Sequence, residues 1–342
     1  MPIGLCSYRQ IVFMTSALNS VKWIQSIAIC DEAPQIDAYL YAQKRFGMKE
    51  NPMQIIETLI NGLSSGGTYA MIALGYTMVY GIAKMLNFAH GDVIMVGGYT
   101  IYVTMAAMGH PLLGLLAAVI FCILLGMGIE KVAYKPLRGA SPLAVLITAI
   151  GVSYLLQSTA QMIFGSAPKM VILADMGNLE MAGLKIPMYV IITLVASMIV
   201  MVVLTLFVKL SKTGRAMIAV SEDRGAAQLM GINVNGIITL TFAIGSGLAA
   251  LAGFFMLLKS PSLTNTLGAM PGIKAFTAAV IGGIGSIPGA MVGGILLGIV
   301  EAVSFKIPVI APYTDAIEFL ILIVILLVKP SGILGKVRRE KV

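Results

Sequence analysis

Residues 111–129 read PLLGLLAAVIFCILLGMGI, a run without one charged or amide side chain. A helix needs about 20 mostly apolar residues to cross the ~30 Å hydrocarbon core of a bilayer. Proline is favoured in the first turn of a helix, so Pro111 marks its start. The stretch therefore predicts a transmembrane helix that begins at Pro111 and ends near Lys131.

The composition extends this interpretation to the whole chain. Of its 342 residues, 58% are apolar and 11% are charged, whereas soluble domains are about 45–50% apolar and about 25% charged. A soluble globule, a disordered chain and a disulfide scaffold are thereby excluded. Long continuous apolar runs and 7% aromatic residues argue against an outer-membrane barrel. We predict an all-α polytopic membrane protein.

Eight to ten transmembrane segments are expected, some of them broken or re-entrant. Together they form a transmembrane domain over 53–330, which includes a cytoplasmic loop at 209–236 and is followed by a basic cytoplasmic tail at 331–342. The apolar runs that predict the segments cover 53–82, 93–108, 111–131, 142–164, 188–208, 237–258, 275–304 and 313–328.

Residues 1–52 differ from the rest of the chain. They hold Trp23 and mixed charges, and their best apolar run, 11–18, is too short to span a membrane. One hypothesis is a mis-called start, with translation beginning at Met53. The alternative is a loosely ordered cytoplasmic extension, which the basic residues between Lys44 and Lys49 favour.

The orientation follows from basic residues beside the segments. The net charge is +8, and the Lys and Arg residues cluster at 131–138, 209–224 and 329–341, which places these groups in the cytoplasm and 165–187 outside. An even number of crossings must then separate 209–236 from the tail. We expect a break at Gly282–Gly289 (GGIGSIPG), where glycine and proline interrupt a helix. The break around 87–92 is expected to conceal a further turn.

The first segment carries a polar stripe. Its residues recur every three or four positions and therefore lie on one helical face. Polar groups are costly in hydrocarbon, so this face must contact protein or a wet pathway. Two interpretations stay open, a pathway-lining face and hydrogen bonding within a packed bundle. The stripe consists of Glu57, Asn61, Ser64, Ser65 and Thr68.

A second polar group interrupts two apolar runs at Asn87, His90 and Asp92. Asp92 is placed to cap the following helix, and a lone His-x-Asp is weak support for a metal. Broken helices in transporters occur near substrate sites, so we include these three residues among the pathway candidates.

The longest polar interruption after residue 53 is 209–236. Residues 215–230 predict one short helix, which Gly231 ends. Met217, Val220, Leu229 and Met230 are expected to supply its apolar contacts. The helix either inserts into a groove on a partner or lies solvated at the membrane surface.

Catalytic and metal motifs are missing from the sequence. Residues 63–67 (LSSGG) superficially resemble the signature of ABC ATPases, but they lie inside a span and no GxxxxGK[ST] loop accompanies them. Neither HExxH nor GxSG occurs, and the three cysteines lack metal or redox spacing.

The acidic residues Glu130, Glu301, Asp315 and Glu318 fall near segment ends, so no buried acidic relay typical of a secondary transporter is expected. GxxxG pairs such as Gly62/Gly66 and Gly294/Gly298 predict close helix packing.

From residue 53 to the end, the chain resembles the LivH-type permeases of bacterial ABC importers for branched-chain amino acids. Several motifs together carry the resemblance, although each one alone is weak. They are YTMVYG (76–81), NFAHGD (87–92), TGRA (213–216), GIN (231–233), KAFTAAVIGGIGSIPGA (274–290) and PSGILG (330–335). Residues 1–52 lie outside the resemblance.

The resemblance implies a multi-pass permease of the bacterial cytoplasmic (inner) membrane that is not an enzyme and that moves leucine, isoleucine and valine by alternating access. It implies a second similar permease, two ABC ATPase subunits and a periplasmic or lipid-anchored amino-acid-binding protein as partners. No cofactor is expected on this chain, since ATP is used by the ATPase. A sister permease for urea or short amides is the alternative. Carried onto 209–236, the resemblance assigns ATPase coupling to Thr213, Gly214, Arg215, Glu222, Asp223, Ala226, Ala227 and Gly231.

Overall fold

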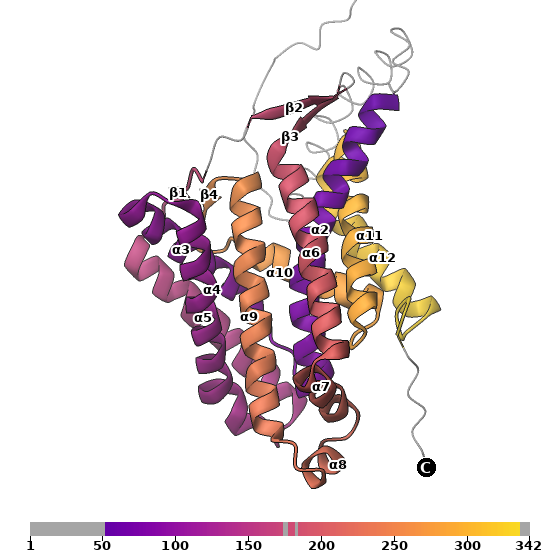
Figure 1. The fold of residues 1–342 in the computed structure, drawn as a ribbon. Coiled ribbons are helices and arrows are strands. Elements are labelled where there is room, and N and C mark those ends of the chain that lie inside the picture. Colours follow the sequence, from indigo (N-terminus) through magenta and orange to yellow (C-terminus); the bar gives the residue numbers. More distant parts are fainter. Residues whose placement is uncertain (1–51, 174–176, 182–183, 336–342) are drawn as a thin grey trace, which may run out of the picture. The chain divides into compact units, whose positions relative to one another are not determined.

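The computed structural model describes residues 52–173, 177–181 and 184–335 (Figure 1). The hypotheses on residues 1–51 and on the tail beyond 335 lie outside these ranges. Eight long helices form the described bundle. They are α2 (Pro52–Ala83), α3 (His90–Met108), α4 (Pro111–Ile129), α5 (Pro142–Phe164), α6 (Met188–Leu210), α9 (Val234–Lys259), α11 (Ile287–Lys306) and α12 (Thr314–Val328).

Within the described residues, seven helical stretches are long and apolar enough to cross a membrane. They include all the long helices except α2, whose serines, threonines and glycines lower its hydropathy. At 32 residues α2 is about 48 Å long, which exceeds the hydrocarbon thickness. The prediction of an all-α polytopic membrane protein is confirmed.

Local sequence signals set several helix boundaries. Pro111 and Pro142 open α4 and α5, and the hydroxyl of Ser141 accepts a hydrogen bond from the Ala144 amide at 3.3 Å. Beyond α4, the π-helix η1 (Glu130–Tyr134) and the 3-10 helix η2 (Lys135–Leu137) extend the helical stretch. The predicted starts at these prolines are thus confirmed.

The centre of the bundle is α2, whose residues from Tyr69 to Val79 are almost all buried. Its closest neighbour is α11, and glycines make this approach possible. A Cβ on Gly298 would lie 2.2 Å from the backbone nitrogen of Gly66, and one on Gly294 would lie 2.5 Å from Ala70. The close packing predicted from the GxxxG pairs is confirmed, since only glycine leaves room for two backbones in contact.

The predicted break in 275–304 is also confirmed. Helix α10 (Ala269–Gly282) stops before Gly283, whose φ is +108°, and α11 starts at Ile287 after a Ser286 cap. The amides of Ile333 and Leu334 donate to the carbonyls of Ile281 and Gly282 at 2.8 and 2.9 Å. The segment after α12 therefore satisfies carbonyls that the end of α10 leaves free.

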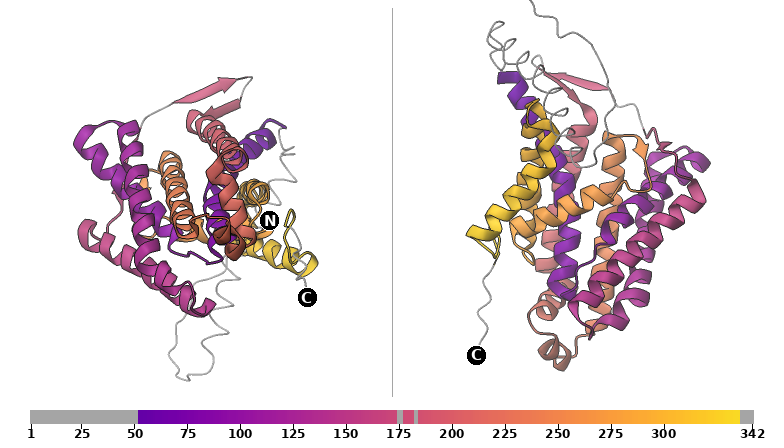
Figure 2. Two further views of the ribbon diagram at one scale, coloured as in Figure 1. Left: turned by 60° about the horizontal axis from the view of Figure 1, so that its bottom comes forward. Right: turned by 180° about the vertical axis from the view of Figure 1, so that it is seen from behind.

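The connection between α2 and α3 is a short turn over 84–89 and adds no further helix. The break around 87–92 thus contains a turn, at 88–89, but no additional membrane-spanning helix. Figures 1 and 2 show that α2 begins at the end of the bundle that carries strands β2 (Asn178–Met181) and β3 (Leu184–Pro187) and ends near α7 (Lys212–Glu222).

Two small antiparallel sheets lie at this first end of the bundle. Strands β2 and β3 form a hairpin in which Leu179 is paired with Ile186. Strand β1 (Lys169–Met170) pairs with β4 (Ser262–Leu263) and joins the loop after α5 to the loop before α10. We refer to this end as the outer end, because it contains the 165–187 region that the charge pattern places outside.

Candidate functional site

Two adjoining cavities open near the outer end, with volumes of about 360 Å³ and 220 Å³. They share Ser64, Ser65, Tyr189 and Lys259. The first also has Thr58, Asn61, Glu301 and Lys306 on its walls, whereas the second is mainly apolar, with Phe255, Met256, Leu267 and Pro271. We call them the polar cavity and the apolar cavity.

Four members of the predicted α2 stripe line these cavities. Asn61 faces the polar cavity, Thr68 faces the apolar cavity, and Ser64 and Ser65 face both. The Lys259 ammonium donates to the Ser65 hydroxyl at 2.9 Å. Glu57 is half-buried and lines neither cavity. The stripe therefore contacts open space as well as protein over most of its length.

Behind the polar cavity, one buried lysine meets three carboxylates. Lys274 of α10 lies 3.1 Å from Glu301, 2.7 Å from Asp315 and 3.3 Å from Glu318. The Tyr69 hydroxyl donates to the same Glu301 oxygen at 2.9 Å. We call these five residues the Lys274 cluster.

The Lys274 cluster shows buried acidic residues that their positions near segment ends did not suggest, and these residues are paired with a lysine. Glu301 and Glu318 do lie near segment ends, but both are buried. Lys274 could have indicated a buried charged cluster from the sequence, because an ionisable residue inside an apolar segment marks a functional or paired site. The sequence alone did not reveal which carboxylates surround it, since they come from two later helices.

The three candidates around the α2–α3 turn lie away from these cavities and are buried. Asn87 accepts a hydrogen bond from the Tyr134 hydroxyl at 2.7 Å, and Asp92 accepts one from the Gln157 amide at 2.8 Å. Asp92 does not cap α3, which begins without a side-chain cap. That part of the prediction is wrong because the carboxylate turns to α5.

His90 packs its ring against Tyr76 with centroids 4.7 Å apart. Its Nε2 atom has no hydrogen-bond partner among the described residues. Within those residues, no group of three or more His, Cys, Asp or Glu side chains could hold a metal ion.

The polar interruption at 209–236 forms two helices where one was predicted. Helix α7 ends at Glu222, and α8 (Arg224–Leu229) follows directly. Asp223 separates them because its extended backbone breaks the helix, while its carboxylate accepts from the Ala226 amide at 3.0 Å and caps α8. We call α7 and α8 the coupling helices, after the role that the resemblance implies for them.

Two glycines shape the coupling helices. Gly214 lies against the end of α6, and a Cβ there would approach the Val208 Cα to 2.4 Å. Gly231 has a φ of +81°, and the Ile232 amide donates back to the Ala227 carbonyl at 3.0 Å. The predicted stop at Gly231 is confirmed, since this left-handed cap favours glycine.

The other predicted coupling residues divide by exposure. Ala227 is buried and Thr213 is half-buried, whereas Arg215, Glu222, Asp223 and Ala226 are exposed. Met217 and Val220 pack inward as expected. Leu229 and Met230, by contrast, are 90% and 82% exposed, so their expected apolar contacts are not made within the described part of the chain and stay a prediction for a partner surface.

Sequence reasoning did not assign a contact to Arg224, which joins the coupling helices to α2. Its guanidinium donates to the carbonyl of Ile82 at 3.1 Å and to that of Ala83. Partial burial and the nearby Arg138 lower the pKa of Arg224. Cations are favoured at a helix C-terminus, so this contact fixes α8 to the end of α2.

Arg138 belongs to a network beside this contact. It pairs with the fully buried Glu130 and also donates to Asn235. Glu130 accepts a further hydrogen bond from Thr239 at 2.8 Å. The network joins the ends of α4 and α9 next to the coupling helices.

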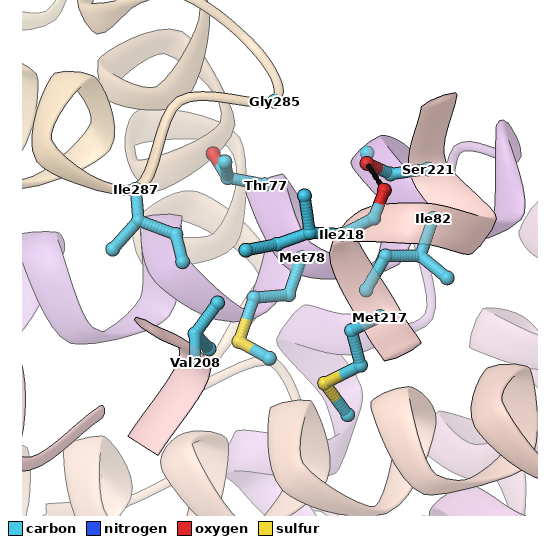
Figure 3. A pocket seen from close by; sticks show the side chains of 10 residues that line it. Thr77, Met78, Ile82, Val208, Met217, Ile218, Ser221, Gly285 and Ile287 are labelled. Carbon is cyan, nitrogen blue, oxygen red and sulfur yellow. Dashed lines mark hydrogen bonds between the residues drawn. The ribbon is translucent and has the colours of Figure 1, made fainter. Parts of the chain in front are cut away.

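A small cavity of about 70 Å³ lies where α7 meets α2, α6 and the α10–α11 loop (Figure 3). Met217 and Ile218 approach it from α7, Met78 and Ile82 from α2, and Gly285 from the loop. Helix α7 therefore borders the same small cavity as the end of α2 and the loop between α10 and α11.

The apolar helices form a multi-pass membrane fold with two cavities near one end and the helices α7 and α8 at the other. Residues 58–326 match the family described as branched-chain amino acid transport system / permease component. The chain belongs to this family. It is a membrane permease rather than an enzyme.

This chain can be aligned with several curated relatives over most of their length. The high-affinity branched-chain amino acid transport system permease protein BraD of Pseudomonas aeruginosa is 45% identical over 302 residues, which cover 84% of this chain and 98% of BraD. LivH of Escherichia coli K12, with the same description, is 41% identical over 86% of this chain and all of LivH. A probable branched-chain amino acid transport permease of Methanocaldococcus jannaschii is 28% identical over 78% of this chain and 88% of that relative.

Proposed function

We propose that this chain carries leucine, isoleucine and valine across the inner membrane as a permease subunit of an ATP-driven importer. The observation that carries the proposal is the 41–45% identity to branched-chain amino acid permeases over at least 98% of their length. The outer cavities support it, because they combine a polar wall with an apolar one, as binding of an aliphatic amino acid requires.

Uptake of labelled leucine into cells that express the chain with its genomic neighbours tests the substrate. We expect uptake that excess isoleucine or valine blocks, that ATP depletion abolishes and that an uncoupler alone leaves intact. ATP-dependent urea uptake without leucine uptake would keep the assignment as an ATP-driven importer but would change its substrate to urea or short amides. Leucine uptake driven by the proton gradient would refute the ATP-driven importer.

The proposed complex contains a second similar permease, two ABC ATPase subunits and a periplasmic or lipid-anchored binding protein. In this assignment ATP is bound and hydrolysed by the ATPase subunits, and this chain needs no cofactor. The coupling helices form the ATPase contact. The exposed Leu229 and Met230 at the tip of α8 support this, because two adjacent apolar side chains in water favour a partner surface.

The proposed mechanism transmits ATPase motion through α2. Arg224 fixes the coupling helices to the inner end of α2, and Asn61, Ser64 and Ser65 lie toward its outer end. A helix of about 48 Å thus joins the ATPase contact to the cavities. A displacement of α8 then alters the cavity walls, which is what alternating access requires.

The coupling assignment is tested with Leu229→Ser/Met230→Ser. We expect the variant to insert normally, to co-purify poorly with its ATPase and to lose most leucine uptake. Met162→Ser is the matched control, because Met162 is 87% exposed but lies near the outer end of α5. Normal ATPase binding and normal leucine uptake by the double variant would show that the tip of α8 is not part of the ATPase contact.

A further inference from the structure

Two lysine side chains line the polar cavity, and neither ammonium group has an anionic partner among the described residues. Lys306 lines it, yet the Lys306 Nζ atom is shielded from solvent and has no hydrogen-bond partner within the described part of the chain. Lys259 lines the same cavity, and its ammonium donates to the neutral Ser65 hydroxyl. An ammonium removed from water without a partner is costly, so the cavity favours an anionic group.

The carboxylate of Glu301, which lines the cavity, is not the anionic partner of Lys306 or Lys259. One oxygen of Glu301 already accepts from Lys274 and from Tyr69. Glu301 also belongs to the Lys274 cluster, in which three carboxylates surround a single ammonium. The side of the cavity formed by Glu301 is therefore electronegative, and its other charged groups, Lys259 and Lys306, are cationic.

A zwitterion matches this separation of charge. A free amino acid carries a carboxylate and an ammonium close together, and the adjoining apolar cavity adds Phe255, Met256 and Leu267 for an aliphatic side chain. The polar cavity has room for the main-chain atoms, since about 360 Å³ corresponds to roughly a dozen water molecules.

We propose that the two outer cavities form one amino-acid-binding site. Lys306 and Lys259 hold the α-carboxylate, the α-ammonium lies toward Glu301, and the branched side chain lies in the apolar cavity. This inference rests on the proposed function and names the groups that recognise its substrate.

The test measures binding of labelled leucine to the purified importer complex in nanodiscs, without the binding protein. Leucinol, which lacks the carboxylate, serves as the comparison ligand. Charge-assisted hydrogen bonds are worth enough to change affinity about tenfold or more. We expect saturable leucine binding to wild type, at least tenfold weaker leucinol binding, and at least tenfold weaker leucine binding to Lys306→Met with leucinol binding unchanged.

Two further variants separate recognition from folding. Lys306→Arg keeps the charge and should retain leucine binding within a few-fold of wild type. Lys131→Met removes an exposed lysine of η1, outside both cavities, and should leave leucine binding unchanged. Gel filtration of each complex shows whether it is assembled.

The results that overturn the site are distinct from those that overturn the proposed function. Equal affinity for leucine and leucinol, unchanged leucine binding by an assembled Lys306→Met complex, or no saturable binding by a complex that does import leucine would each refute the site alone. Displacement of leucine by equimolar chloride would mark a site for small inorganic anions instead. Failure of the wild type to import leucine in the uptake experiment would refute the proposed function.

Discussion

Lys274→Met is the sharpest test of what holds α12 to the bundle. The lysine is the only cation that the described structure places within the Lys274 cluster, and its side chain is 7% exposed. Methionine keeps most of the volume and removes the charge. Three carboxylates, with contacts to the ammonium between 2.7 and 3.3 Å, are then left together.

The cost follows from how exposed each carboxylate is. The Asp315 side chain is 51% exposed and can be solvated by water, whereas those of Glu301 and Glu318 are 10% and 0% exposed. Removing one partner from a buried ion pair costs about 3–5 kcal/mol. We expect the free energy of unfolding of Lys274→Met to fall by about this amount, mostly because of Glu301 and Glu318.

The measurement is unfolding of the purified permease in detergent by titration with SDS, followed by circular dichroism. The double variant Lys274→Met/Glu318→Gln should recover about 1–3 kcal/mol, because contacting residues are coupled. Lys131→Met is the control and should stay within about 0.5 kcal/mol of wild type. A loss below about 1 kcal/mol for Lys274→Met, or strict additivity in the double variant, would refute the reasoning.

Three further variants test helix packing and coupling. Gly298→Ala places a Cβ 2.2 Å from Gly66 and should lower the free energy of unfolding by about 1–3 kcal/mol, whereas Gly128→Ala, which meets no atom within 4 Å, should not; equal stabilities in the SDS titration would contradict the close α2–α11 contact. Gly231→Val forces a β-branched residue to a φ of +81°, and at about 1–2 kcal/mol of strain it should reduce leucine uptake in an inserted protein; normal uptake and ATPase binding would mean that this cap does not matter for coupling. Arg224→Met removes the link to α2, so the complex should still hydrolyse ATP but import leucine at least tenfold more slowly, and proportional loss of both activities would argue against a coupling role.

Sequence reasoning succeeded where the signal was local. The break at Gly282, the helix starts at Pro111 and Pro142 and the cap at Gly231 each depend on one residue and its immediate neighbours. The helical period also placed most of the α2 stripe correctly, since a single face of α2 meets the cavities.

The failures concern residues whose partners are distant in the sequence. Asp92 looked like a cap, but its carboxylate accepts a hydrogen bond from the side-chain amide of Gln157, which lies 65 positions away in the sequence. The sequence analysis did not single out Lys274, whose partners Glu301 and Glu318 come from two later helices. Such pairings depend on which helices become neighbours, and helical period and composition do not specify this.

The glycine contact between α2 and α11 restricts where this protein can move. Backbones that touch through Gly66, Gly294 and Gly298 leave no side chains that could change rotamer and absorb a displacement. These two helices must therefore travel as a single body. If the cavities widen during transport, we expect the change at the walls contributed by α6 and α9, and the hydrogen bond from Lys259 to Ser65 of α2 would then have to break.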